Sequence, residues 1–132
     1  MKLRLFPLVL IGLITSCAYT APFRKTAAED GGRMALLMLT AVEQRPGRRT
    51  AFFRDTMNVL DNLPEQEGLL GYSFRFQVIG RKAWTMTSWK DETAQDRFVS
   101  SPVHRVAVAN SRTTVIEMKF YTLPVPANSL PM

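Results

Sequence analysis

The chain has 132 residues, a net charge of +6, a single cysteine and a single histidine, and its length suits one domain. One cysteine and one histidine exclude a disulfide within the chain, a thiolate metal site and a zinc site built from several imidazoles, so we expect no metal. The charge is too mild to indicate a nucleic-acid partner, and the sequence has neither a Gly-x-Ser-x-Gly nucleophile motif nor a glycine-rich phosphate loop.

The N-terminus is typical of a bacterial lipoprotein signal. Two basic residues precede an apolar run, Leu5–Leu13, and the short residues Thr15 and Ser16 lead to Cys17. We therefore expect residues 1–16 to be a signal peptide that is removed, and Cys17 to be acylated. Acyl chains would hold the protein on a membrane of the cell envelope.

Two other interpretations of this segment are a plain secretory signal and a short transmembrane helix. The apolar run falls well short of the roughly 20 residues that a span needs. Ala18 stands where an aspartate would retain a lipoprotein in the inner membrane, which favours the outer membrane. Residues 17–32 show little periodicity and end in two glycines, so we predict a lipid-anchored linker there.

The predicted domain spans residues 33–123 and begins with a strand. Residues 34–42 form a short apolar run, which favours a strand buried on both faces. After a Pro-Gly break, residues 48–63 carry the apolar stripe of an amphipathic helix, and Pro64 ends it.

The rest of the domain is predicted to contain a hairpin, two helices and a last strand. Alternation over 71–79 and the β-rich run 83–89 predict a hairpin. Asp91 and Ser101 suit the N-caps of helices over 92–99 and 102–109. A last strand is predicted over 114–122, and the proline-rich tail, 124–132, is excluded from a sheet interior.

These elements predict an α+β fold of the ferredoxin-like β-α-β-β-α-β type. Helices would cover one face of the sheet. The first strand is apolar on both faces, so the other face needs a cover. A second copy, packed sheet to sheet, would provide it, which predicts a homodimer in the form of a dimeric α+β barrel. The alternative is a monomer with a thicker helical cover.

The segment 69–108 resembles the antibiotic biosynthesis monooxygenase superfamily of dimeric α+β barrels. The likeness rests on the Gly-Leu-Leu-Gly-Tyr entry at 68–72, the strand 84–89, the Lys-Asp-Glu corner at 90–92 and the helical residues 98–105. The superfamily includes cofactor-independent oxygenases of phenols and quinols, haem-degrading monooxygenases and many small proteins of unassigned activity.

The resemblance also bears on haem. Haem degraders of the superfamily use an asparagine in the first strand and a tryptophan and a histidine in the second helix. Aligned on Trp89, the tryptophan position falls on Phe98 and the histidine position on Val108, and the first strand contains no asparagine. His104 lies one helical turn before Val108. The resemblance therefore implies that no haem and no other cofactor is bound.

Cofactor-free oxygenases bind an electron-rich ring and stabilise its anion by stacking and hydrogen bonding. On this resemblance, His104 and Arg75 are the candidate catalytic residues. The ligand would be small and hydrophobic or aromatic. The candidate substrate-binding residues are aromatic as well: Tyr72, Trp84, Trp89 and Phe98.

Each candidate has a structural alternative. Trp84 and Trp89 lie five residues apart on one strand and face opposite ways, so at most one can line a cleft. Tyr72 shares its face with two phenylalanines and fits a core, whereas Arg75 points to the other face and can be solvated. His104, in the first turn of its helix, is expected to be neutral there, or to serve only as a cap.

Two hypotheses of function follow. The chain is a lipid-anchored, cofactor-independent monooxygenase for a small aromatic or quinol-like compound, or it is a non-catalytic domain that binds a small molecule or an envelope partner. The fold alone does not decide between them, because this fold supports many activities.

Overall fold

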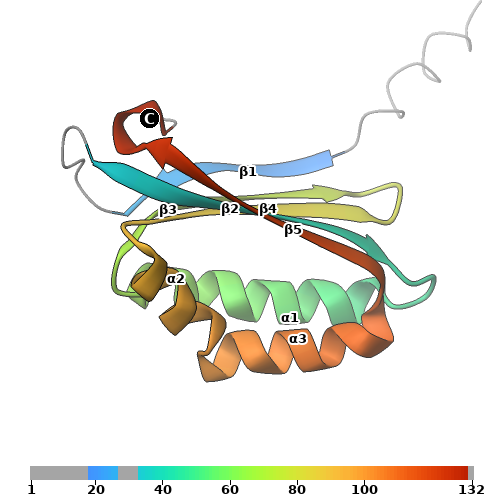
Figure 1. Ribbon diagram of the computed structural model, residues 1–132. Helices are drawn as coiled ribbons and strands as arrows, with labels where there is room; N and C mark the ends of the chain where they lie inside the picture. Colours follow the sequence, from blue (N-terminus) through green and yellow to red (C-terminus); the bar gives the residue numbers. More distant parts are fainter. Residues whose placement is uncertain (1–17, 27–32, 131–132) are drawn as a thin grey trace, which may run out of the picture.

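The computed structural model describes residues 18–26 and 33–130, which form two layers (Figure 1). A five-stranded antiparallel sheet is one layer, and the helices lie against one of its faces. The predicted signal peptide, Cys17 and residues 27–32 lie outside the described part. In chain order the elements are β1 (Ala18–Lys25), β2 (Met34–Gln44), α1 (Arg49–Asn62), η1 (Leu63–Glu65), β3 (Leu69–Gln77), β4 (Lys82–Trp89), α2 (Glu92–Val99), α3 (Pro102–Thr114), β5 (Val115–Pro126) and η2 (Ala127–Ser129).

The sheet order is β1-β3-β4-β2-β5, and all neighbouring strands are antiparallel. Without β1, this is the order of a ferredoxin-like β-α-β-β-α-β unit, so the predicted fold class is confirmed. The register decides which side chains share a face. Met38 lies opposite Thr87 and Thr122 on the side of the helices, and the next residue, Leu39, lies opposite Met86 on the outer side.

Strand β1 differs from the prediction, which placed residues 17–32 in a linker. It pairs with β3 as an edge strand, from Ala18 opposite Gln77 to Lys25 opposite Gly71. The register shifts between Ala21 and Arg24, around Pro22, which an edge strand tolerates because proline has no N–H to donate. This break removes the alternation by which a strand is recognised in a sequence.

Gly71 allows β1 to approach β3 closely. A Cβ atom at this position would lie 2.2 Å from the ring of Phe23 and 2.9 Å from the carbonyl oxygen of Arg24. Only glycine therefore fits beneath Phe23, and the strand pair depends on it.

The predicted proline-rich tail is also part of the sheet. β5 runs on to Pro126, with Pro124 opposite Leu36. β5 is an edge strand, so one of its sides has no neighbouring strand. A proline whose nitrogen lies on that side removes no hydrogen bond from the sheet. Ala127 and Leu130, which follow, are buried. Residues 131–132 lie outside the described part.

The helices confirm the sequence patterns with two exceptions. α1 ends where η1 begins, and Pro64 lies in that 3-10 turn. Asp91 caps α2 by accepting the N–H of Ala94 at 2.8 Å. Ser101 makes no side-chain cap bond, and α3 continues past Asn110 to Thr114. None of the helices in the described part is both long and apolar enough to cross a membrane.

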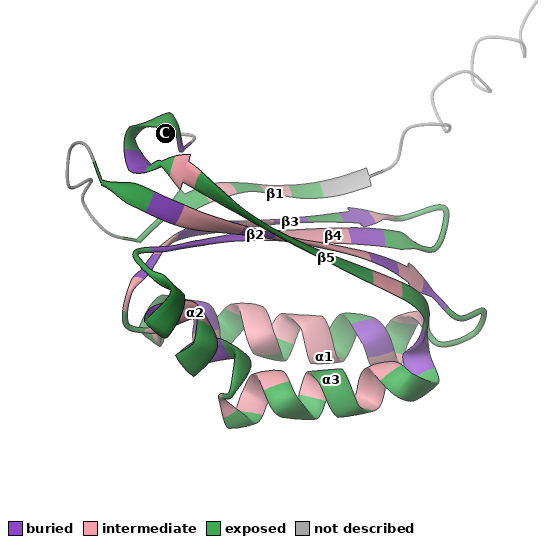
Figure 2. Ribbon diagram, viewed as in Figure 1, coloured by how far each residue is buried: buried purple, intermediate pink, exposed green. Residues whose placement is uncertain are grey.

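The core lies between the sheet and the helices. Its buried side chains come from the strands and from the helices that cover them. The turns at either end are exposed (Figure 2). One cluster is centred on Trp89 and Phe98 and the other on Phe74 and Phe52. Leu60 on α1 packs against both clusters and so connects them.

The outer face of the sheet is apolar and only partly covered. At one end, Phe23 and the buried Ala127 and Leu130 pack over Ala35, so the chain covers that end itself. Elsewhere the face carries half-buried and exposed apolar side chains, with Tyr121 at 51% and Leu123 at 49% exposure, beside Leu37, Leu39, Trp84 and Met86.

Candidate functional site

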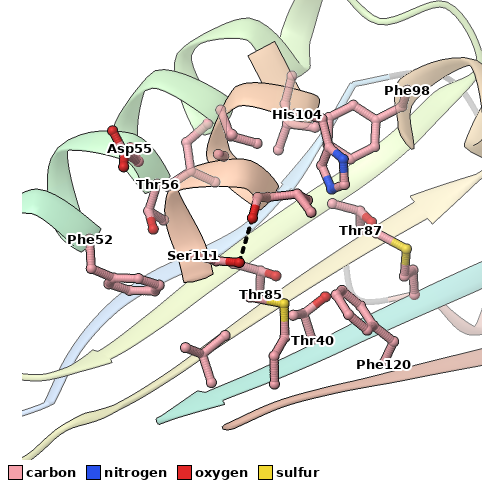
Figure 3. A pocket seen from close by; sticks show the side chains of 18 of the residues that line it. Thr40, Phe52, Asp55, Thr56, Thr85, Thr87, Phe98, His104, Ser111 and Phe120 are labelled. Carbon is pink, nitrogen blue, oxygen red and sulfur yellow. Dashed lines mark hydrogen bonds between the residues drawn. The ribbon is translucent and has the colours of Figure 1, made fainter. Parts of the chain in front are cut away.

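A cavity of about 110 Å³ lies between the sheet and the helices α1 and α3 (Figure 3). Its walls are mainly apolar, and a few polar groups converge on it, as in many small-molecule sites. The aromatic side chains in the lining are Phe52, Phe98 and Phe120, and the groups that carry polar atoms are Thr40, Asp55, Thr56, Thr85, Thr87, His104, Ser111 and Thr114.

Three strands form the floor of the cavity. Thr40 on β2 lies directly between Thr85 on β4 and Phe120 on β5, and all three side chains face the helices. The hydroxyl groups of Thr40 and Thr85 form no hydrogen bond with the described residues. The next threonine on β4, Thr87, accepts the indole N–H of Trp89 at 3.0 Å. The floor thus presents two neighbouring hydroxyls that are available to a ligand.

His104 reaches the cavity from the first turns of α3. Its imidazole packs against Phe98, with ring centroids 4.7 Å apart, and Phe98 in turn stacks on Trp89 at 4.9 Å. Nδ1 lies 3.1 Å from the carbonyl oxygen of Val99. These contacts hold the ring in place. Figure 3 shows the imidazole beside Phe98, between α3 and the strands.

The environment of His104 favours its neutral form. Desolvation by burial lowers the pKa of His104 from its ordinary value of 6.5, and the hydrogen bond to Val99 offsets part of that change. A carbonyl oxygen can only accept, so Nδ1 carries the hydrogen and donates it. Nε2 is therefore the basic nitrogen, which suits a general base near neutral pH.

Asp55 is a second ionisable group in the lining, and it is not among the residues predicted from the sequence. Its side chain is 12% exposed and accepts a hydrogen bond from Asn110 at 3.0 Å. Asn110 lies six residues after His104 on α3, which is about 9 Å along the helix axis. The two ionisable groups therefore lie apart in the cavity and do not form a hydrogen-bonded dyad.

The structure brings together two of the six predicted site residues in the cavity, His104 and Phe98. Trp89 is fully buried behind Phe98, and Tyr72 belongs to the same core cluster. Trp84 and Arg75 lie on the outer face, where the guanidinium carbon of Arg75 is 5.7 Å from the Trp84 ring centroid. Arg75 therefore cannot reach a ligand in this cavity.

The sequence carried a signal for the residues that were missed. Asp55 interrupts the apolar stripe of α1, three residues after the buried Phe52 and four before Val59. A carboxylate on a buried helix face indicates a special environment. Thr40 and Thr85 are likewise polar side chains that face the helices from their strands. Their position opposite each other depends on register, which the sequence does not specify.

Among the described residues, no three His, Cys, Asp or Glu side chains cluster closely enough to bind a metal ion. The ionisable groups of the cavity are His104 and Asp55. What this arrangement can do unaided is accept a proton at Nε2, offer hydroxyl groups to a polar atom of a ligand, and enclose a flat apolar molecule between phenylalanine rings.

Comparison with known proteins shows similarity in structure alone. No family model and no curated protein matches the sequence. A candidate antibiotic biosynthesis monooxygenase from Chloroflexus aurantiacus superposes with a TM-score of 0.57 at 15% identity, covering 67% of this chain and 90% of that one.

Two candidate monooxygenases also superpose. The one from Fusobacterium nucleatum has a TM-score of 0.69 at 14% identity and covers 79% of this chain, and the one from Lactobacillus acidophilus has 0.64 at 13% and covers 77%. The chain spans 48% and 49% of their lengths, about half of each. The chain therefore has the α+β, ferredoxin-like fold of antibiotic biosynthesis monooxygenase-like proteins, and its activity has to be argued from the site.

Proposed function

We propose that the chain is a cofactor-independent monooxygenase that binds a small aromatic or quinol-like compound in the cavity between sheet and helices. The observation that carries the proposal is the environment of His104. A neutral imidazole, oriented by Phe98 and Val99, faces an apolar cavity. Apolar surroundings disfavour a lone imidazolium, so the base stays unprotonated before the substrate binds. When the imidazole takes the proton of a phenol, the phenolate beside it stabilises the imidazolium that forms.

The chemistry follows from the substrate. Nε2 of His104 takes the hydroxyl proton, and the electron-rich phenolate ring then reduces O₂. One oxygen atom becomes a quinone carbonyl on the ring and the other leaves as water, so the substrate supplies all four electrons. The hydroxyls of Thr40 and Thr85 would hold a ring oxygen, and the phenylalanine rings would pack against the ring faces.

The proposal includes no haem. Val108 occupies the position that a haem-ligating histidine would have by resemblance, and an isopropyl group cannot ligate iron. His104, one turn earlier, faces a cavity of about 110 Å³, which suits a small ligand. The residues present therefore suit a ligand that carries its own electrons.

Oxygen consumption tests the proposal directly. The wild-type protein is mixed with a panel of hydroquinones and naphthols, and oxygen uptake is followed with an electrode. His104→Asn keeps a donor for the Val99 carbonyl but removes the base, so turnover should fall about 10² to 10⁴-fold. Arg105→Ala, on the exposed neighbour, is the matched control and should keep the wild-type rate. No uptake with any member of the panel would overturn the proposal.

A non-catalytic binding domain is the second candidate, and a specific observation favours it. The cavity lining contains no lysine or arginine that could stabilise a phenolate. Binding without reaction would appear as saturable quenching of the two tryptophans by the same compounds, in the absence of oxygen uptake. Absorption titration with haemin provides the comparison for a haem-binding protein.

The proposal extends to the location of the domain. Acylated Cys17 would anchor it in the cell envelope, on the periplasmic or outer face of a membrane, with the outer membrane favoured, and a homodimer would cover the outer face of the sheet. Mass spectrometry of the protein extracted from membranes tests the anchor, because processing at Cys17 adds acyl mass to a chain that begins there. A mature chain without acyl mass would refute it.

A further inference from the structure

The end of the domain where β1 begins combines a positive charge with exposed aliphatic side chains. β1 starts at Ala18, opposite Gln77, beside the turn that joins β3 to β4. The β2–α1 turn and the α3–β5 junction lie at the same end (Figure 1). Glu43 pairs with Lys82 in the sheet, and the backbone N–H of Gln44 donates to the carbonyl of Arg81.

The β3–β4 turn presents the aliphatic part of this surface. Val78 is 45% exposed and Ile79 is 64% exposed, at the tip of the hairpin. Figure 2 shows the tip as exposed. Arg49 donates hydrogen bonds to the carbonyl groups of Val78 and Gly80, so the tip is held in place by α1. An ordered hairpin with its largest apolar side chains in solvent suggests a partner that accepts apolar groups.

Basic residues surround the hairpin tip. The ranges 43–49, 78–82 and 112–117 contain two acidic residues, Glu43 and Glu117, and six basic ones: Arg45, Arg48, Arg49, Arg81, Lys82 and Arg112. Glu43 is paired with Arg81 at 3.2 Å, and Glu117 with Lys119 at 3.2 Å. Arg45, Arg48 and Lys82 form no salt bridge with the described residues. The surface is therefore cationic around an aliphatic tip.

From this combination we infer that this end of the domain docks on an anionic phospholipid bilayer, with Val78 and Ile79 inserted among the headgroups and the arginines against the phosphates. The inference rests on the proposed acylation of Cys17. Cys17 directly precedes Ala18, so an acyl chain there would leave no spacer between the bilayer and β1. The anchor and the cationic surface then face the same membrane, and the cavity is held at a fixed height above it.

Site-specific fluorescence tests the docking surface in the full, membrane-extracted chain. Acylation would consume the only native thiol, so an environment-sensitive fluorophore can be placed at Ile79→Cys, or at Asn128→Cys in η2 at the opposite end. In vesicles that contain phosphatidylglycerol, the probe at 79 should shift to the blue and be quenched by nitroxide lipids, whereas the probe at 128 should report water. Equal, water-like signals at both positions would overturn the inference.

Two charge reversals distinguish electrostatic docking from the anchor alone. Arg45→Glu with Arg48→Glu should abolish the blue shift at position 79 and lower nitroxide quenching at least about fivefold. Arg24→Glu with Arg105→Glu changes the net charge equally at the opposite end and should leave the signal intact. If both pairs have the same effect, the surface is not the docking site.

The outcome for the anchor is read separately. The acyl mass of the same preparation shows whether Cys17 is modified, so a missing acyl chain refutes the anchor and not the surface. In that case the labelled chain, in a Cys17→Ser background, is added to preformed vesicles. Binding to anionic vesicles with the blue shift at 79 still supports the surface, and its absence refutes it.

Discussion

His104 links the stability of the fold to pH. Burial lowers its folded-state pKa below 6.5, so between the two values the unfolded chain binds more protons than the folded one. The stability that depends on a neutral imidazole is complete above pH 6.5, and is lost as the pH falls from there through the folded pKa. His104→Asn cannot titrate. Its free energy of unfolding, from urea denaturation between about pH 7.5 and about pH 5, should therefore fall less than that of the wild type. Identical pH profiles would contradict this prediction.

Gln44 is a buried amide without partners. It is 1% exposed, and neither Nε2 nor Oε1 has a hydrogen-bond partner among the described residues. Such a group costs about 1–3 kcal/mol, so Gln44→Met, which keeps the length of the side chain, should raise the free energy of unfolding by about 1 kcal/mol or more. Gln66→Met is the matched control, because the Gln66 amide donates to the carbonyl of Asn62 at 3.3 Å. Chemical denaturation would disprove the idea if Gln44→Met were the less stable variant.

At the residue scale, alternation along a strand predicted on which face of the sheet a side chain lies better than it predicted which side chains line the cavity. It correctly placed Trp84 and Trp89 on opposite faces and Arg75 on the outer face. It could not show that Trp89 lies behind Phe98 and not beside a ligand, because that depends on how α2 packs on the sheet. Thr40 and Thr85 become neighbours only through the register of β2 and β4.

At the element scale, the N-cap residues of α2 and α3 look alike in the sequence but differ in whether they make a capping hydrogen bond. Asp91 accepts the N–H of Ala94, whereas the hydroxyl of Ser101 is buried without a partner. Asp91→Ala should therefore lower the free energy of unfolding by about 1 kcal/mol, and Asp91→Asn should restore most of it. Ser101→Ala should not lower this free energy, because the Ser101 hydroxyl makes no capping bond that could be lost. Thermal denaturation of the three variants decides, and equal losses for Asp91→Ala and Ser101→Ala would show that capping is not the cause.

The helices and the four strands of the ferredoxin-like unit could be predicted because each has a regular apolar period and a stop signal, such as Pro64 after α1. The edge elements could not. Proline in 18–25 and in 124–126 indicates the end of a strand when only the sequence is known. An edge strand needs hydrogen bonds on one side only, and it therefore tolerates proline. Their strand character comes from the neighbours, β3 and β2, and not from their own sequence.

At the scale of the whole molecule, the two faces of the sheet are covered to different extents. The helix-facing side is closed by α1, α2 and α3 and holds the cavity. The outer side is closed at one end only, where Phe23, Ala127 and Leu130 cover Ala35. The chain's own edge elements therefore restrict where a second copy can sit, and leave the central strands β2 and β4 and the adjoining part of β5 as the available surface.

Leu39 is the residue with which to test a homodimer on that surface. It lies on β2 between Met86 and Tyr121, and both neighbours are apolar and at least partly exposed. A dimer of ordinary stability buries roughly 800 Å² on each partner, and apolar area contributes about 25 cal/mol per Å². Leu39→Glu would place an unpaired charge at the centre of this area. Light scattering should therefore give a dimer mass for the wild type and a monomer mass for Leu39→Glu at micromolar concentration. Val106→Glu adds the same charge at a residue on α3 that is 59% exposed, and should remain dimeric. A wild-type protein that is monomeric throughout, or a Leu39→Glu variant that stays dimeric, would rule out this face as the interface.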